Sequence, residues 1–496
     1  MTVYNINKAI GRASSGIEYA QSYRNSLLSG ELEQTYLFLD YINTNYIEFT
    51  KKLGFKNNEV VWIYGYLAGQ KNTVSTYTFS SFEITLDDSY SRKNEDEFVL
   101  YSSKTNSLSF RVWKLNENIL DRVDELVDGQ LTRVLHYSDR LTNVEHYSKG
   151  TLLSRVFYNP QGEVAYRQYY SNREISLTTI SGKMLFGRNA FFQEFFKRLS
   201  WSQEDVIVLD RSLNIADAVF PQLNQAKVAV VIHAEHFNQK RSSLNRTSWN
   251  NYYEYVFSNS DRVDWFIVST NKQADVLREQ FKRMNKDSSN IFVIPVGYID
   301  TLPSIEETNV KSSCRLMTAS RIADEKHIDT LIHATVEAKK GLPNLEFYIY
   351  GEGKKRKNLQ KLIDDLGASS YIHFMGHHDL EKEYKKYDGY LSGSTSEGFG
   401  LTILEALSYG LPIIGLDVPY GNQELVESGV NGFLIEPRSQ KENAKHLSKG
   451  ILSLFSPTFD LKRSIEFSQQ KAKHYLAHEV KSKWMLLLSQ HKEGLS

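Results

Sequence analysis

Short and nearly unbroken apolar runs recur along this chain, with segments of helical spacing between them. The runs of a first series occupy residues 205–209, 228–232, 265–268 and 291–294, and residues 272–283 form a predicted helix between two of them. Strands that are buried on both faces of a parallel sheet have this composition. The pattern therefore predicts a doubly wound α/β domain.

A second series of the same kind starts at residue 315. Its predicted strands are residues 315–319, 347–350, 372–374, 389–392 and 413–416. Two doubly wound domains that face one another form a deep cleft, which is a usual place for a ligand. A helical tail is predicted from residue 459 onward.

The amino terminus begins with a predicted strand, a glycine turn and a helix. Residues 2–6 are β-prone, residues 11–16 form a loop of small residues, and the helical spacing begins at Ile17. A second strand follows at residues 36–39. The loop lies at the carboxyl end of the first strand, where α/β sheets bind their ligands.

Residues 71–182 have a different texture, in which polar residues alternate with aromatic and β-branched ones. This alternation predicts an antiparallel meander inserted into the first domain. Its aromatic residues either form an exposed face that binds a partner or an extended peptide, or they pack inward. We therefore expect the following domains: residues 1–70 and 183–299 for the first, 71–182 for the insertion, 300–480 for the second after a polar linker at 300–311, and 481–496 for a terminal helix.

The strongest functional signal is a pair of carboxylates, Glu397 and Glu405, with a glycine-containing loop between them. Gly398 and Gly400 allow a ligand to approach the backbone closely, and the amides at the start of the following helix favour an anion. That helix is predicted to end at Gly410 in a left-handed cap. Two carboxylates beside a phosphate-attracting helix start suit a sugar and a ribose, so the pattern indicates a nucleotide-sugar site. Alternatively, the carboxylates only complement the helix dipole.

Two cations, Arg321 and Lys326, follow the first predicted strand of the second domain at its carboxyl end. An arginine fork and a lysine point charge can neutralise a diphosphate leaving group. Cations at this spacing are more often surface charges. Their place in the half of the chain that also carries Glu397 favours the functional interpretation.

Histidines and a glycine end other predicted strands. His233 ends an apolar strand of the first domain, where a neutral imidazole could bind a sugar hydroxyl, and a hydrogen-bonded structural histidine is the alternative. His236 is assigned a structural role. Gly376 and His377 end a strand of the second domain, where they either present backbone groups to a base edge or form a structural turn.

Composition excludes several classes of protein. A formal net charge of zero gives no long-range attraction to nucleic acid or to an anionic membrane. The single cysteine, Cys314, excludes an intramolecular disulfide and fits a reducing cytoplasm. There is no apolar stretch of membrane-spanning length and no secretory signal pattern, so we expect a cytoplasmic protein. His and Cys residues lack metal-ligand spacing, and no Asp-x-Asp pair ends an apolar strand of the first domain. Fixed cations and helix amides, rather than a metal held by such a pair, are therefore expected to balance a diphosphate.

These residues resemble those of retaining glycosyltransferases with the two-domain GT-B architecture, and specifically of their family 4. The resemblance rests on Glu397 with Glu405, on Arg321 with Lys326, and on the loop at residues 11–16. It covers essentially the whole chain, loosely in the insertion, and is greatest with the protein O-glycosyltransferases of accessory secretion systems in Gram-positive bacteria. The closer match lies in residues 4–7, 16–20, 233–236, 249–253, 395–400 and 417–422.

The resemblance implies transfer of N-acetylglucosamine, with retained configuration, from its UDP donor to Ser or Thr hydroxyls of a serine-rich repeat adhesin before export. UDP-glucose is the alternative donor, and a lipid or polysaccharide is the alternative acceptor. The resemblance also implies a heteromer, such as a heterotetramer, with a catalytically silent sister glycosyltransferase subunit, and at most peripheral contact with the inner face of the cell membrane. A non-catalytic binding subunit would be expected to lack the cations or the carboxylate pair, and all four residues are present here.

The same resemblance implies roles for individual residues, without a metal or another cofactor. Catalysis is assigned to Arg321, Lys326, Glu397 and His233. Contacts with the nucleotide are assigned to Gly16, Ile17, Glu18, Tyr19, Gly376, His377 and Glu405. Contacts with the sugar are assigned to His233, Glu397, Gly398, Phe399 and Gly400.

Overall fold

A computed structural model describes the chain except for residues 11–15, 43–45, 106, 244–245, 305–312 and 494–496. Residues 11–15 of the small-residue loop and residues 305–311 of the predicted linker lie outside the described residues. The chain divides into two compact units. The first comprises Met1–Val231 and Asn251–Asp264, and the second comprises Ile232–Asn250 and the described residues from Trp265 to Glu493.

A parallel sheet of seven strands has the order β17-β16-β15-β14-β1-β2-β3. All four residues of β14 are buried, as expected for a strand covered on both faces. The strands are β1 (Thr2–Asn7), β2 (Glu33–Phe38), β3 (Val60–Trp62), β14 (Val206–Leu209), β15 (Lys227–Ile232), β16 (Trp265–Val268) and β17 (Ile291–Val293). The helices between them are α1 (Gly16–Leu28), α2 (Tyr46–Lys52), α3 (Ile63–Leu67), α5 (Gly187–Leu199), α6 (Ala216–Val219), α7 (Glu254–Ser258) and α8 (Asn271–Arg283). The predicted doubly wound architecture is confirmed.

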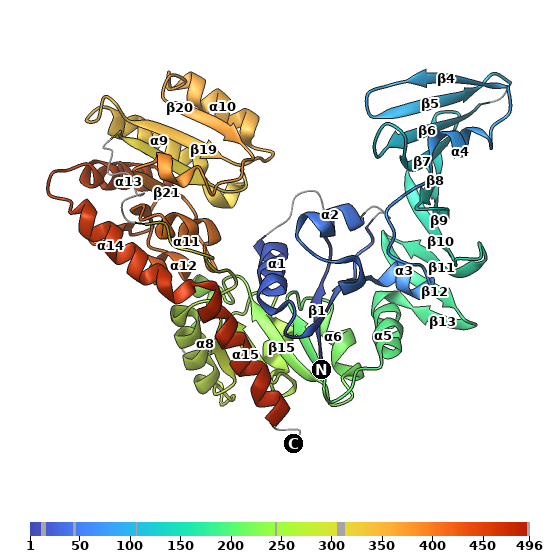
Figure 1. Cartoon of the computed structure of the whole chain (residues 1–496), viewed down its shortest axis with the longest axis horizontal. Helices are drawn as coiled ribbons and strands as arrows, with labels where there is room; N and C mark the ends of the chain where they lie inside the picture. The colour runs from blue at the N-terminus through green and yellow to red at the C-terminus, as the bar shows by residue number, and fades with distance from the viewer. Residues whose placement is uncertain (11–15, 43–45, 106, 244–245, 305–312, 494–496) are drawn as a thin grey trace. The chain divides into compact units, whose positions relative to one another are not determined.

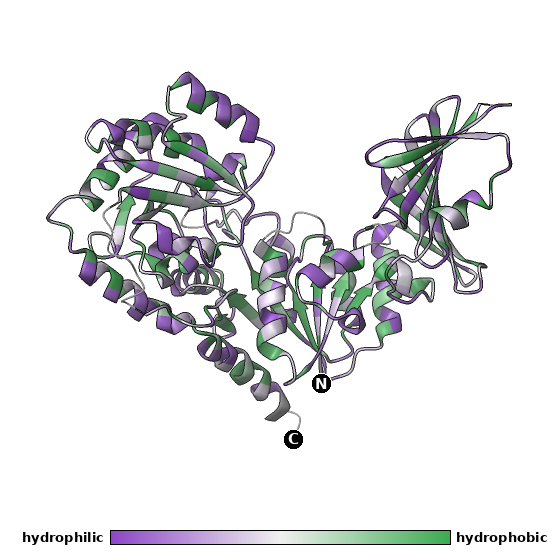
Figure 2. Ribbon diagram, turned by 45° about the horizontal axis from the view of Figure 1, so that its top comes forward, coloured by the Kyte–Doolittle hydropathy of each residue, from purple (hydrophilic) through white to green (hydrophobic). Residues whose placement is uncertain are grey.

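The predicted insertion is an antiparallel meander of ten strands, β4 to β13, in which each strand pairs with the next (Figure 1). Hydrophobic and hydrophilic residues are interleaved along these strands (Figure 2). The strands are β4 (Tyr90–Asn94), β5 (Phe98–Ser103), β6 (Leu108–Lys114), β7 (Leu120–Val127), β8 (Gln130–Tyr137), β9 (Leu141–Ser148), β10 (Thr151–Tyr158), β11 (Val164–Ser171), β12 (Glu174–Ile180) and β13 (Lys183–Phe186). One short helix, α4 (Phe79–Glu83), precedes them and packs on the sheet.

The aromatic residues of the meander fit both alternatives. Phe157 and Tyr166 face each other across β10 and β11, are buried, and stack with ring centroids 4.4 Å apart. Tyr169 and Phe186, by contrast, have exposed fractions of 41% and 72%. The sheet therefore has an internal aromatic core and an exposed aromatic set near its last strands.

The second parallel sheet has the order β20-β19-β18-β21-β22-β23. Its strands are β18 (Arg315–Ala319), β19 (Glu346–Tyr350), β20 (Ile372–Gly376), β21 (Gly389–Ser392), β22 (Ile413–Leu416) and β23 (Gly432–Ile435). One apolar core packs α9 (Ile328–Lys339), α10 (Arg356–Asp365) and α13 (Gln440–Leu454) against one face. A second core packs α11 (Leu401–Ser408) and α12 (Gly421–Leu425) against the other.

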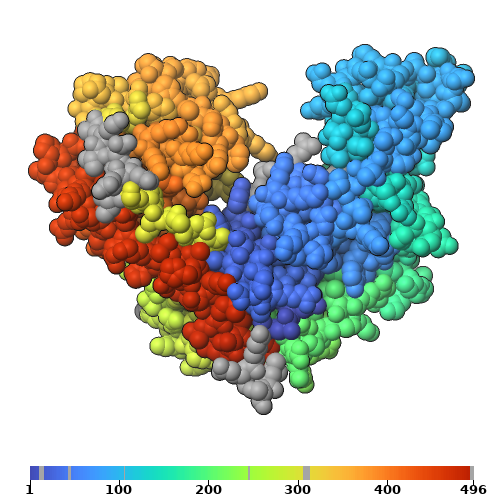
Figure 3. All heavy atoms as spheres, in the orientation of Figure 1, coloured from blue at the N-terminus to red at the C-terminus, as the bar shows by residue number. Residues whose placement is uncertain are grey.

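The helical tail consists of α14 (Leu461–Ala472) and α15 (Ala477–Glu493), which form a continuous red band in Figure 3. In α15 the side chains of Val480, Trp484, Leu487 and Leu488 are buried at helical spacing, whereas that of Leu486 is 63% exposed. Trp265 of β16 contacts His491 with ring centroids 6.2 Å apart. Within the described part of the chain, no helix is both long and apolar enough to cross a membrane.

Strand order identifies where each sheet can bind a ligand. In the second sheet the chain runs outward from β18 to β20 and then restarts on the other side of β18 with β21. In the first sheet the same reversal separates β1 from β14. Ligands of doubly wound sheets bind outside the carboxyl ends of the strands at such a switch point.

Candidate functional site

The loops that follow β18 and β21 meet at the switch point of the second sheet. The Lys326 ammonium lies 2.7 Å from Glu397 Oε2 and 3.3 Å from Ser394 Oγ. The side chains of Lys326 and Glu397 are each 19% exposed. Among the described residues, these two contacts use two of the three ammonium protons, which leaves the third for an anionic ligand.

A glycine allows the two loops to touch. A Cβ atom at Gly393 would lie 2.7 Å from the carbonyl oxygen of Lys326 and 2.9 Å from that of His327. Real Cβ atoms essentially never approach a carbonyl oxygen to 2.7 Å. The loop after β21 can therefore reach the Lys326 backbone only because position 393 carries no side chain.

Arg321 has a different partner from Lys326. Its guanidinium forms an ion pair with Glu325 at 3.0 Å, and the two side chains are 59% and 53% exposed. An ion pair this exposed contributes little to stability, so a stronger anion can replace the Glu325 carboxylate. The structure thus places Arg321 on the same loop as Lys326 but does not bring it to Glu397.

Gly398 brings His233 to the same place as Glu397. A Cβ atom at Gly398 would lie 2.2 Å from the carbonyl oxygen of His233 and 3.4 Å from the Cα atom of Ala234. The loop after β21 therefore lies directly on the segment that follows β15. Both belong to the second compact unit, although they are far apart in the sequence.

The loop then turns into α11. Gly400 has a φ of +86°, which favours glycine, and its carbonyl accepts the first helical hydrogen bond, from Leu404 N at 2.9 Å. Gly410 has a φ of +75° after the helix, so the predicted left-handed cap is confirmed. Phe399 is buried and its ring packs 5.6 Å from that of Tyr475, so only its backbone can face a ligand.

Glu405 lies on α11 and is partly buried. The hydroxyl of Tyr384, a buried side chain, donates to Glu405 Oε2 at 2.7 Å. This contact fixes the orientation of the carboxylate relative to the helix. A second tyrosine, Tyr390 of β21, connects α11 to β18 through Thr402 Oγ1 at 2.8 Å and the carbonyl oxygen of Ala319 at 2.9 Å.

Gly376 and His377 lie at the carboxyl end of β20. The carbonyl oxygen of Gly376 accepts from Gly351 N at 2.7 Å, and the His377 side chain is exposed. A Cβ atom at Gly351 would lie 1.9 Å from the carbonyl oxygen of Ser320, next to Arg321. Backbone contacts therefore align the loops after β20, β19 and β18 along one edge of the sheet.

Gly16, Ile17, Glu18 and Tyr19 form the first turn of α1 in the first compact unit. Glu18 is buried, accepts from Asn7 Nδ2 at 3.0 Å, and lies 3.7 Å from Arg211 Nη2. Its carboxylate is therefore engaged within the unit. Tyr19, which is 41% exposed, presents the largest accessible side chain of the four.

Several residues around these loops were not identified from the sequence. Ser394 contacts Lys326, Tyr384 holds Glu405, and Tyr390 joins two elements. For Tyr390 the sequence held a signal, because a hydroxyl within a buried strand needs a hydrogen-bond partner. In the structure, burial raises the pKa of this hydroxyl to about 12. Tyr384 lies in a short turn with no periodic pattern, so its contact depends on the folded structure.

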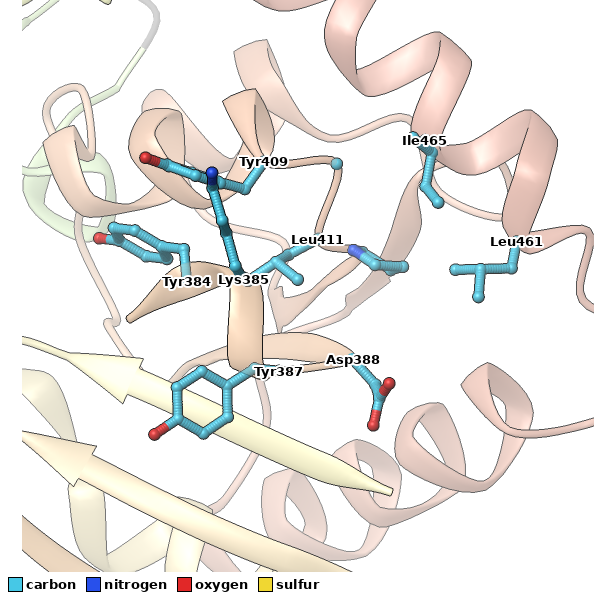
Figure 4. A pocket seen from close by; sticks show the side chains of 10 residues that line it. Tyr384, Lys385, Tyr387, Asp388, Tyr409, Leu411, Leu461 and Ile465 are labelled. Carbon is cyan, nitrogen blue, oxygen red and sulfur yellow. The ribbon is translucent and has the colours of Figure 1, made fainter. Parts of the chain in front are cut away.

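A shallow hollow at the opposite edge of the second sheet contains none of the predicted site residues (Figure 4). Its lining includes Asp388 and Pro412, which precede β21 and β22 at their amino ends, and Leu461 of α14. Ligands of such sheets bind at the carboxyl ends instead. Within the described residues, no group of His, Cys, Asp and Glu side chains could hold a metal ion.

Comparison with known proteins was consistent with this geometry. Residues 304–456 match the family described as Glycosyl transferases group 1, and residues 90–178 match the GtfA extended beta-sheet domain. The GtfA subunit of UDP-N-acetylglucosamine–peptide N-acetylglucosaminyltransferase from Streptococcus parasanguinis is 39% identical over 497 residues, which cover 98% of each chain.

Two solved structures share the fold over nearly the full length. The pneumococcal O-GlcNAc transferase GtfA in complex with UDP and GlcNAc superposes with a TM-score of 0.92 at 35% identity, covering 99% of both chains. A chain of a GtfA/B complex gives a TM-score of 0.88 at 35% identity, covering 99% of this chain and 100% of the other.

Proposed function

The chain belongs to the GtfA subunits of UDP-N-acetylglucosamine–peptide N-acetylglucosaminyltransferase, and from this premise we propose how it acts. It is a glycosyltransferase that transfers N-acetylglucosamine from UDP-N-acetylglucosamine to a polypeptide. The observation that carries the assignment of its site is the Lys326–Glu397 pair at the switch point of the second sheet. A cation for phosphate and a carboxylate for sugar hydroxyls lie there within one hydrogen bond of each other.

The second-sheet residues would divide the donor between them. Lys326 would bind the diphosphate with its remaining proton, and Arg321 would exchange Glu325 for it. Glu397 would accept from sugar hydroxyls, and the amides after Gly398 and Gly400 would lie beside the sugar. The contact between Gly398 and the His233 backbone supports a role for His233 toward the same sugar.

The nucleoside half of the donor would bind farther along the same edge. Glu405, oriented by Tyr384, would accept from ribose hydroxyls, and Gly376 and His377 would contact the base through their backbone. Gly16, Ile17, Glu18 and Tyr19 would lie near UDP. For Glu18 this role falls to its backbone, because its carboxylate is engaged by Asn7.

We propose that configuration at the anomeric carbon is retained without a protein nucleophile. The bond between the anomeric carbon and the phosphate oxygen breaks, and the acceptor hydroxyl oxygen bonds to that carbon from the same face. The acceptor proton passes to the departing phosphate oxygen, so atoms and charges balance. The main catalytic contribution of the protein is then the fixed positive charge of side chains that bind the departing diphosphate.

The proposed acceptor is a serine-rich repeat adhesin, modified on Ser and Thr hydroxyls before export. The decisive experiment incubates the chain and its partner subunit with a serine-rich peptide and UDP-N-acetylglucosamine. Mass spectrometry should find one N-acetylhexosamine added at Ser or Thr. NMR of the product should find an α-linkage between this sugar and the peptide, as in the α-linked donor. Modification only with UDP-glucose, or only of a lipid or a polysaccharide, would contradict the proposal.

We propose that the ten-stranded sheet binds the sister glycosyltransferase subunit or the acceptor. Phe186, Leu177 and Tyr169 face one another across β13, β12 and β11, so their side chains line up on one face of the sheet. Phe186 and Tyr169 are exposed there. A stripe of this kind, which ends on β13 at the edge of the sheet, suits a partner that packs an apolar surface or adds a strand.

This proposal is tested with Tyr169→Ser and Phe186→Ser in one chain, compared with Val127→Ser. Val127 is 38% exposed at the end of β7 and lies outside the stripe. The double variant should lose co-purification of the sister subunit or binding of the serine-rich peptide, whereas Val127→Ser should retain both. Unchanged binding of both would contradict the proposal.

We propose a cytoplasmic location, with at most peripheral association at the inner face of the membrane. With Cys314 as its single cysteine, the chain can form no internal disulfide, which fits a reducing compartment. Fractionation of cells should recover the chain in the soluble fraction or release it from membranes with salt. Recovery that requires detergent would contradict this location.

A further inference from the structure

The segment that follows β15 is tightly held within the second compact unit. The side-chain amide of Gln273 in α8 donates to the carbonyl oxygen of Ala234 at 2.9 Å. Asn250 N donates to the carbonyl oxygen of His236 at 2.9 Å, and Asn250 Nδ2 to that of Glu235 at 3.2 Å. The residues from His233 to His236 are therefore a fixed platform on which other loops can rest.

His236 is fully buried in this platform and has a polar partner on each side of its ring. Its Nε2 lies 2.8 Å from Gln280 Oε1, and its Nδ1 lies 3.2 Å from the hydroxyl of Tyr420. Because the Gln280 oxygen can only accept, the imidazole carries its proton on Nε2 and its Nδ1 accepts from Tyr420. The two rings also stack, with centroids 5.6 Å apart and planes 17° apart.

Tyr420 is in turn bonded to the backbone of Glu397. Tyr420 N donates to the carbonyl oxygen of Glu397 at 2.7 Å, and Gly421 N donates to the same oxygen at 2.9 Å. Glu397 N donates to the carbonyl oxygen of Pro419 at 3.2 Å. Both backbone groups of Glu397 are therefore bonded to the segment that carries Tyr420.

A second connection runs beside the first. Ser396, the residue before Glu397, lies close enough to the carboxylate of Glu235 to lower its pKa against the larger, opposite effect of burial. The platform thus holds the loop through the side chain of Tyr420 and through close backbone packing at Gly398, and it lies beside Ser396. These contacts lie on both sides of Glu397 in the sequence or bond to its backbone, so they fix the point from which its side chain extends.

We propose that His236 and Tyr420 are positioning residues that fix Glu397 for its contact with Lys326 and the donor sugar. This inference rests on the proposed function. A carboxylate acts on a sugar hydroxyl only when it is held within a fraction of an ångström, and a neutral His–Tyr pair buried in the platform provides that support. His236 therefore has a function beyond the structural role expected from the sequence.

The experiment compares Tyr420→Phe, His236→Asn and His236→Leu in the full chain with its partner subunit. Phenylalanine removes only the hydroxyl, asparagine keeps an acceptor near the position of Nδ1, and leucine removes it. Tyr420→Phe and His236→Leu should lower kcat roughly 10-fold to 100-fold with little change in KM, and His236→Asn should recover most of the loss. Tyr420→Phe combined with Glu397→Gln should be no slower than Glu397→Gln alone, because the pair acts through Glu397.

Hydrogen exchange of the substrate-free chain tests the same inference without catalysis. In Tyr420→Phe the amides of Glu397, Tyr420 and Gly421 should exchange faster than in the wild type, whereas those of α9 should not change. The inference would be overturned if Tyr420→Phe changed neither the exchange rates nor kcat. It would also be overturned if the losses of kcat in Tyr420→Phe and Glu397→Gln were additive. If the wild-type chain fails to transfer N-acetylglucosamine, the proposed function is overturned instead. The hydrogen-exchange result then decides by itself whether His236 and Tyr420 position Glu397.

Discussion

A single half-buried ion pair dominates the site at the scale of residues. Lys326 and Glu397 are 71 positions apart in the sequence and 2.7 Å apart in the structure. Their chemical types could be predicted, because each follows a buried strand at its carboxyl end. Their contact could not, because it depends on the close approach of two loops at Gly393.

We expect Lys326→Ala to reduce turnover far more than stability. Loss of one preorganised charge should cost about 2–4 kcal/mol of transition-state stabilisation. Steady-state kinetics and thermal unfolding measure the two effects separately. Lys340→Ala is the matched control, since Lys340 directly follows α9 and pairs with the exposed Glu337 of that helix, and it should alter neither quantity. Near-normal turnover of Lys326→Ala would refute the assigned role.

Gly398→Ala should damage both activity and folding. The added Cβ would lie 2.2 Å from the carbonyl oxygen of His233, so one of the two backbones must move. Gly30→Ala is the comparison, because Gly30 has a φ of +82° but open space around it and should lose only about 1–2 kcal/mol for conformation. Urea unfolding compares the two, and an equal loss in both would show that the loop does not rest on His233.

The free energy of unfolding should fall as the pH drops toward 4, in part because of His236. Burial lowers the pKa of this histidine from 6.5 to about 4 in the folded chain. Between these values the unfolded chain binds a proton that the folded chain excludes. The contribution of His236 to the free energy of unfolding is therefore complete above the unfolded pKa and is lost as the pH falls toward the folded pKa. Burial raises the pKa of the neighbouring Glu235, so the contribution of this group to the free energy of unfolding increases as the pH falls, opposite to that of His236.

The variant His236→Asn separates the two groups, because it removes only the imidazole titration. Urea unfolding at several pH values should give a flatter curve for this variant than for the wild type between pH 6.5 and about 4. Parallel curves for the two proteins would show that His236 titrates normally in the folded chain.

At the scale of elements, the buried parallel strands and the helix α11 follow the sequence closely. Both ends of α11 are marked by glycines with positive φ, which is why its start and end were predictable. The strands β3 and β23 were not predicted. Val60–Trp62 is short and runs directly into α3, and Gly432–Ile435 begins with a glycine that lowers strand propensity.

The last helix allows a matched test of packing. Trp484 of α15 is 4% exposed, whereas Leu486 on the same helix is 63% exposed. Trp484→Ala should lower the free energy of unfolding by about 3–5 kcal/mol, and Leu486→Ala should change it by about 0.5 kcal/mol or less. Chemical denaturation distinguishes them, and comparable losses would place α15 differently from the structure described.

At the scale of the whole molecule, the alternation of apolar runs and helices was sufficient to predict two doubly wound sheets and an inserted meander. The partners of individual side chains were less accessible to sequence reasoning. Residues 232–250 show the reason, since this segment follows a strand of the first sheet but packs in the second compact unit. Contacts of this kind depend on how distant loops meet, which hydrophobic periodicity does not encode.

Binding of UDP should stabilise the whole chain against unfolding, because only the folded state holds Lys326 near its partners. At a concentration of about 100 times the dissociation constant, the gain should be roughly 2.7 kcal/mol. Differential scanning fluorimetry should show a rise in Tm for the wild type and a smaller one for Lys326→Ala at the same UDP concentration. An equal rise in both would place the diphosphate away from Lys326.

The mutual neutralisation of Lys326 and Glu397 also bears on which molecules the site admits. A chloride ion that approaches the ammonium meets a carboxylate already in place, and it has no hydroxyl to offer that carboxylate in exchange. A sugar nucleotide carries an anionic part and a hydroxylated part in one molecule, so each member of the pair gains a new partner when it enters. The same two charges thereby screen out abundant small anions while remaining ready for the donor.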